Sequence, residues 1–159
     1  MERTFLFKPN KEKSMTPIYC IELDYTTQSI KDMSILLDIE YGGIEKSVIG
    51  NRNGAGGLHF IYDNLRNSKS VEDLLTILQK KTGKQRPIIC LDNKKIFLSG
   101  QSASMFSDIS AQSVMLNCQG KRKHANNYHF MYLDEYIRNN LTEDTLELIQ
   151  KNYREIYDF

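Results

Sequence analysis

The side chains best suited to chemistry form a run of cations in the second half of the chain. Gly120 is followed at once by Lys121, Arg122, Lys123 and His124. Consecutive cations behind a helix can neutralise backbone phosphates, because each such contact releases a counterion from the nucleic acid. The run therefore predicts a nucleic-acid contact, and a solvated basic loop is the alternative.

The segment before this run predicts a helix over 110–119 whose exposed side chains could read bases. At helical spacing, Val114 and Cys118 face the core. The more exposed positions are then Gln112, Ser113, Met115, Leu116 and Gln119. Amide and hydroxyl groups hydrogen-bond to base edges, so Gln112, Ser113 and Gln119 are candidate contacts, with Lys94, Lys95 and Arg52 as further cations.

Two histidines, His59 and His129, each precede a phenylalanine and form the most obvious catalytic pair. A nuclease needs carboxylates grouped with His or Lys around a metal ion. Neither a His-Asn-His cluster nor a pair of acidic residues stands out in the sequence. We therefore expect strand histidines with a structural hydrogen bond, no catalytic residue, no metal and no cofactor. A degenerate homing-type nuclease stays open as an alternative.

The cysteines do not form a pattern that binds metal or builds disulfides. Cys20, Cys90 and Cys118 are odd in number and include no Cys-x-x-Cys pair. Cys20 and Cys90 lie inside apolar runs, where a free cysteine behaves as a small buried hydrophobe.

The chain contains an internal repeat that must position all these residues. Residues 17–62, the first repeat, align without a gap to residues 87–132, the second repeat, at an offset of 70 with 13 identities in 46 positions. Average composition would give roughly three. The similarity continues from 71–80 to 142–151 at an offset of 71. The chain therefore contains one sequence unit that is present twice.

Each repeat predicts the same order of elements. Apolar runs at 17–23 and 87–91 pair with 25–28 and 95–98 as hairpins. Ser29 and Ser99 are expected N-caps of a first helix, with apolar stripes that include Met33 and Leu36, or Ala103 and Phe106. Second helices over 41–49 and 110–119 end at Gly50 and Gly120, and last strands follow at 58–62 and 128–132.

The predicted fold is α+β, with two tandem β-β-α-α-β helix-turn-helix-like modules, each followed by an amphipathic helix. Residues 1–83 hold the first module with an N-terminal strand and a linking helix, and 84–159 hold the second module with a C-terminal helix. A hinge is expected at 82–85. The C-terminal helix is a candidate homodimer surface, because four of its apolar side chains look exposed: Tyr153, Ile156, Tyr157 and Phe159.

A net charge of +1 hides opposite charges in the two halves. The first repeat has three basic and six acidic residues, whereas 84–132 has seven basic and two acidic. In the first repeat only Arg52 of the basic run remains, the second helix holds Gly42 and Gly43, which weaken it, and Glu45 would repel phosphate. We expect the first repeat to keep the fold without ordinary DNA binding, and its acidic surface to suit a protein partner or to imitate nucleic acid.

Four stretches of the second repeat carry a family resemblance: 87–92 (PIICLD), 108–110 (DIS), 120–125 (GKRKHA) and 128–132 (YHFMY). Together they resemble NUMOD1, a helix-turn-helix DNA-binding repeat of phage, intron-encoded and homing endonucleases. The resemblance implies that Gly120 ends the second helix and that Lys121, Arg122 and Lys123 contact the DNA backbone. It also implies that Phe130 and Tyr132 belong to the final core strand.

These features predict a non-enzymatic nucleic-acid-binding protein of phage or mobile-element type, with double-stranded DNA or structured RNA as its partner. The alternative is a phage counter-defence inhibitor, of the anti-CRISPR type, that binds a Cas nuclease or its guide RNA. No apolar run approaches the roughly 20 residues of a membrane span, and residues 1–7 are too short and too charged for a signal peptide. We therefore expect no membrane contact and a phage-encoded protein in the host cytosol.

Overall fold

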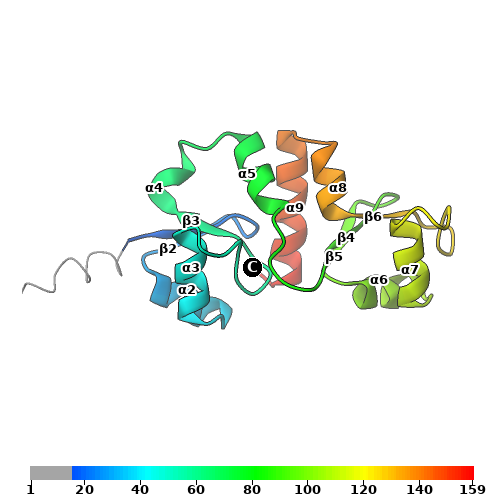
Figure 1. Cartoon of the computed structure of the whole chain (residues 1–159), viewed down its shortest axis with the longest axis horizontal. Helices are drawn as coiled ribbons and strands as arrows, with labels where there is room; N and C mark the ends of the chain where they lie inside the picture. The colour runs from blue at the N-terminus through cyan, green and yellow to red at the C-terminus, as the bar shows by residue number, and fades with distance from the viewer. Residues whose placement is uncertain (1–15) are drawn as a thin grey trace, which may run out of the picture.

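The computed structural model describes residues 16–159, and within them the chain is α+β, as predicted. Two three-stranded antiparallel sheets and eight helices make up this part of the chain (Figure 1). The strand expected at the N-terminus lies outside the described residues, as do residues 1–7, which are not expected to form a signal peptide.

The two sheets have the same strand order and the same register. In the first half, β1 (Ile18–Cys20) lies between β2 (Tyr25–Thr27) and β3 (Phe60–Tyr62). In the second half, β4 (Ile88–Cys90) lies between β5 (Lys95–Phe97) and β6 (Phe130–Tyr132). Ile18 pairs with Tyr62 on the neighbouring strand of one sheet, and Ile88 pairs with Tyr132 in the other. The strand pairing therefore keeps the 70-residue offset of the alignment.

Two helices connect the second and third strand of each sheet. They are α2 (Ile30–Leu37) and α3 (Tyr41–Val48) in the first half, and α6 (Gly100–Ser107) and α7 (Ala111–Cys118) in the second. The hydroxyls of Ser29 and Ser99 cap the first helix of each pair, as predicted. Asp38 and Asp108 end these helices in the left-handed conformation, with φ of 55° and 59°. Aspartate tolerates that conformation better than most residues, so the turn between the helices is short.

The apolar stripe expected on the first helices is narrower than predicted. Ile30 and Met33 are buried, but Leu36 is 47% exposed. Phe106, at the equivalent place on α6, is 37% exposed. Leu37 is partly buried against the core together with Ile30 and Met33, so Leu36 lies outside the packed face of α2.

Each last strand is followed by two helices, where one was expected. These are α4 (Asp63–Arg66) and α5 (Val71–Leu78), and then α8 (Leu133–Arg138) and α9 (Glu143–Ile156). The sequence similarity at 71–80 and 142–151 predicted α5 and α9. The short α4 and α8 complete too few turns to produce a recognisable apolar stripe.

The trailing helices join the two halves through one core. Leu75 of α5, Ile137 of α8 and Ile149 of α9 are fully buried and belong to the same cluster as Ile18 of β1. Figure 1 shows α5, α8 and α9 in the middle of the molecule, where α5 contacts both α8 and α9.

The C-terminal helix α9 hydrogen-bonds to both halves. Gln150 Nε2 donates to the Ile21 carbonyl at 3.1 Å, and Asn152 Oδ1 accepts from the Ile96 backbone N–H at 3.1 Å. Tyr153 is 3% exposed, so it packs inside the molecule and does not offer the dimer surface expected of it. Of the other residues proposed for that surface, Ile156 and Phe159 are exposed.

The linker between the repeats is packed against the first half at the expected hinge. A Cβ built on Gly54 would lie 2.4 Å from the Leu58 carbonyl oxygen and 2.4 Å from Thr82 Cγ2. Only glycine leaves room for this approach. Contacts with the first repeat therefore position the linker at Thr82.

Candidate nucleic-acid interface

The predicted basic run lies on the surface, in the loop 119–129 between α7 and β6. Lys121, Arg122, Lys123 and His124 are all exposed. Within residues 16–159, none of these side chains forms an ion pair with a carboxylate. Their charges are therefore available to an external anion.

Side-chain hydrogen bonds hold this loop in place on both sides. The buried Asn117 side chain of α7 donates from Nδ2 to the Arg122 carbonyl at 2.8 Å, and its Oδ1 accepts from the Phe130 backbone N–H. Asn126 Nδ2 donates to the Ser107 carbonyl at 2.8 Å, at the end of α6. The loop is thus fixed to both helices and to the last strand, which limits the conformational entropy lost when a ligand binds.

Arg122 is directed back along α7. Its Nη1 donates to Ser113 Oγ at 3.0 Å, so these two candidate contacts are bonded to each other. Ser113 Oγ also accepts from Ser110 Oγ at 3.0 Å. The Ser113 hydroxyl is thus engaged within the protein, while Arg122 keeps further N–H donors for a ligand.

The exposed face of α7 agrees in part with the prediction. Gln112, Met115 and Gln119 are exposed, and Val114 and Cys118 are buried. Ser113 and Leu116 are only half-buried, so they project less than expected. The two glutamine amides are the polar groups that this face offers to a ligand.

The remaining candidate cations lie apart from the loop. Lys94 and Lys95 are exposed on the β4–β5 hairpin. Lys94 Nζ donates to the Leu91 carbonyl at 2.8 Å and lies 5.8 Å from the centre of the Tyr136 ring, on the side of α8. Lys95 Nζ lies 5.3 Å from the centre of the Phe106 ring, on α6. Only Lys95 is therefore next to the helix pair.

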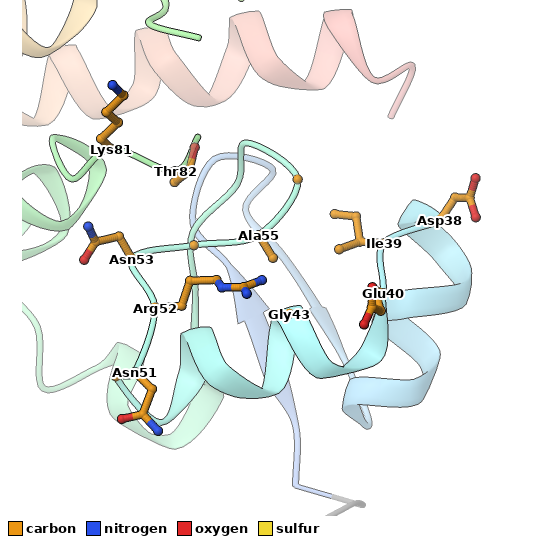
Figure 2. A pocket seen from close by; sticks show the side chains of 13 residues that line it. Asp38, Ile39, Glu40, Gly43, Asn51, Arg52, Asn53, Ala55, Lys81 and Thr82 are labelled. Carbon is orange, nitrogen blue, oxygen red and sulfur yellow. The ribbon is translucent and has the colours of Figure 1, made fainter. Parts of the chain in front are cut away.

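Arg52 lines an open hollow of the first repeat (Figure 2). Its guanidinium lies over α3 beside Gly43, where a Cβ would meet Arg52 Nη1 at 3.3 Å. This matches the second repeat, in which Arg122 reaches Ser113 at the position equivalent to Gly43. The same hollow is lined by Asp38, Glu40 and Lys81, so its charge is mixed and does not favour phosphate.

Each repeat joins its histidine to an acidic residue that follows the first strand. Glu22 accepts from the His59 backbone N–H at 2.8 Å and contacts His59 Nδ1 at 2.6 Å. Asp92 accepts from the His129 backbone N–H at 2.7 Å and contacts His129 Nδ1 at 3.1 Å. The sequence showed both acids as a similar pair in the alignment, but their contact with the histidines was not predicted.

The first of these pairs is buried and its histidine is bonded on both ring nitrogens. His59 Nε2 lies 2.7 Å from the Lys80 carbonyl, which can only accept, so Nε2 donates this bond while Nδ1 contacts the Glu22 carboxylate. Burial lowers the pKa of His59, but the charge and hydrogen bond of Glu22 outweigh burial, and the pKa is raised above its ordinary value of 6.5. These bonds give His59 the structural role expected for it.

The second pair is exposed to solvent. The side chains of His129 and Asp92 are 52% and 39% exposed. The hydrogen bonds from the His129 backbone N–H and ring lower the pKa of Asp92. No group of three or more His, Cys, Asp or Glu side chains in residues 16–159 is arranged to hold a metal ion.

The helices of the described region are all too short or too polar to cross a lipid bilayer. In comparisons with known proteins, the chain matches no family model, no curated protein and no solved structure at a significant level. The resemblance of the second repeat to NUMOD1 therefore stays a prediction.

Proposed function

We propose that this chain is a non-enzymatic nucleic-acid-binding protein that contacts duplex DNA through its second repeat. In this proposal α6 and α7 act as a helix-turn-helix, with α7 in the major groove. Gln112 and Gln119 face the base edges, and Lys121, Lys123 and His124 contact phosphates. Arg122 braces the loop against Ser113 and contacts the backbone with its remaining N–H groups.

The observation that supports the proposal most strongly is that the cations of the basic loop are exposed on an anchored loop. Its three consecutive cations are exposed, and the loop is anchored to α7 through Asn117. None of these three cations forms an ion pair with a carboxylate of residues 16–159. A basic loop without a binding role is usually interspersed with acidic residues. A fixed cluster of like charges next to a helix instead supports phosphate contacts.

The first repeat provides an internal comparison for this loop. Asn51 and Asn53 occupy the positions of Lys121 and Lys123, while Arg52 keeps the position of Arg122. The backbone that carries the loop is thus retained with two fewer charges. Exchanging these residues should change binding with little change of fold.

The test measures the affinity for a DNA duplex by fluorescence anisotropy between about 50 and 200 mM salt. Each phosphate contact contributes roughly 0.9 to the slope of log K against log salt. The double substitution Lys121→Asn and Lys123→Asn should therefore reduce the slope by about 2. The matched control, Lys31→Asn with Lys46→Asn in the first repeat, should leave it unchanged. Affinity that does not depend on salt, or equal losses in both variants, would exclude the proposal.

A second candidate function follows from the acidic first repeat. Glu40 and Glu45 are exposed there, and Ile35 is 69% exposed beside them in sequence. Acidic and apolar groups together support a protein partner with a basic surface, as a counter-defence inhibitor of a Cas nuclease would need. Cleavage by a purified Cas nuclease that is unchanged at a tenfold excess of this protein would exclude this candidate for that enzyme.

A further inference from the structure

The second repeat contains a group of aromatic rings that the first repeat lacks. Phe97, Phe106, Tyr128 and Phe130 follow one another with ring centres 5.2, 5.3 and 6.2 Å apart. At the equivalent positions the first repeat has Thr27, Leu36, Leu58 and Phe60. The aromatic group and the basic loop are therefore the two features that distinguish the second repeat from the first.

Only the middle of this aromatic group reaches the surface. Phe97 and Phe130 are buried, whereas Phe106 is 37% exposed and Tyr128 is half-buried. Packing of the core explains the first two rings. It does not require Phe106 at a position where the first repeat has an exposed leucine, Leu36.

Phe106 lies next to one of the cations already described, and Tyr128 belongs to the loop that carries the others. Tyr128 belongs to the same loop as Lys121 and Lys123, and Asn126 in that loop is bonded to Ser107, the residue after Phe106. On the other side, Lys95 Nζ lies 5.3 Å from the Phe106 ring centre. A ligand held against Phe106 would therefore meet flat aromatic surface together with the positive charge of Lys95.

Nucleic acid with unpaired bases combines the groups that such a surface would recognise. A base stacks on an aromatic side chain, while the phosphates on either side of it bind cations. In a fully paired duplex the base faces are covered by their neighbours, so a ring cannot stack on them. We infer that Phe106 and Tyr128 bind an unpaired base of the nucleic acid whose phosphates contact Lys95 and the basic loop. This inference rests on the proposed function and narrows its ligand to nucleic acid with a bulge, junction or single-stranded segment.

The experiment compares two DNA probes, one fully paired duplex and the same duplex with a central two-base bulge. The wild-type protein should bind the bulged probe about tenfold more tightly, within the range given by stacking one base. The double substitution Phe106→Leu and Tyr128→Leu, which installs the residues of the first repeat, should abolish this preference and leave affinity for the paired duplex unchanged. The control Tyr41→Leu removes an exposed ring of the first repeat and should keep the preference.

A second measurement uses only the wild-type protein, so it does not depend on how the variants fold. The fluorescent base 2-aminopurine, placed in the bulge, should be quenched when the protein binds, because stacking on an aromatic ring quenches it. Equal affinity for both probes together with no change in fluorescence would overturn the inference and leave the proposed function standing. Failure to bind either probe would overturn both.

Discussion

Replacing His59 with alanine should destabilise the protein by about 3–5 kcal/mol, the usual cost of removing one partner from a buried ion pair. The side chains of His59 and Glu22 are only 5% and 3% exposed, and their charged atoms are 2.6 Å apart. The substitution leaves the Glu22 carboxylate buried, with the residue-59 backbone N–H as its one remaining hydrogen-bond partner among residues 16–159. It also removes the bond to the Lys80 carbonyl, which ties the linker to the sheet.

The second repeat offers a matched control for this prediction. His129→Ala removes the equivalent contact with Asp92, but there both side chains are more than a third exposed. Water replaces the lost partner at such a site, so exposed ion pairs contribute little. The same substitution at equivalent positions should thus lower the free energy of unfolding strongly at His59 and very little at His129.

The assay is urea unfolding followed by circular dichroism. With a slope of about 2 kcal/mol per molar urea, the midpoint of His59→Ala should fall by roughly 2 M, and that of His129→Ala should stay within error of the wild type. Equal midpoint shifts in the two variants would show that burial does not set the strength of these pairs, because the two pairs differ mainly in burial.

Three further predictions concern pH, the anchor of the basic loop and the packed linker. Burial lowers the pKa of His59, but the charge and hydrogen bond of Glu22 raise it by more, so the pKa in the folded state lies above 6.5. The stability that His59 contributes should therefore be complete below pH 6.5 and be lost as the pH rises through the folded-state pKa. The difference in urea midpoint between wild type and His59→Ala should accordingly shrink above that pH; a constant difference would contradict this. Asn117→Ser introduces the residue found at the equivalent position of the first repeat, Ser47. It should leave the Phe130 N–H without a hydrogen bond, at a cost of about 1–3 kcal/mol in stability, and weaken duplex binding in the anisotropy assay. Unchanged binding would show that the loop does not need this anchor. Gly54→Ala should cost about 1–3 kcal/mol through overpacking, whereas Gly83→Ala, with open space around it, should leave the urea midpoint within error or higher.

The sequence predicted the strands of both sheets, the helix pairs, α5 and α9, but not α4 and α8. It could do so because the same sequence unit is present twice in the chain. Caps at Ser29 and Ser99 and the helix-ending glycines Gly50 and Gly120 occupy equivalent positions, and each is a local signal that needs no tertiary context. The registers of the two sheets then agree at the same offset. Repetition thus strengthened signals that would be weak in a single copy.

Features that depend on contacts between the halves could not be predicted in this way. Burial of Tyr153 follows from packing of α9 against both halves, whereas its own helix suggested an exposed face. The role of Asn117 depends on a loop that returns to α7. Helical spacing predicts Phe106 in the core, but its ring is partly exposed. The alignment does show a difference at this position, because the first repeat has Leu36 there.

The proposed function requires that the second repeat, and not the first, contacts nucleic acid. Its most direct test is a ¹⁵N-resolved NMR titration of the full chain with a DNA duplex that contains a bulge. The signals of Asn51 and Asn53 should not shift, and the largest chemical-shift changes should occur at five residues of the second repeat: Gln112, Gln119, Lys121, Lys123 and Tyr128. Changes centred on the first repeat, or a spectrum that does not change at saturating DNA, would contradict it.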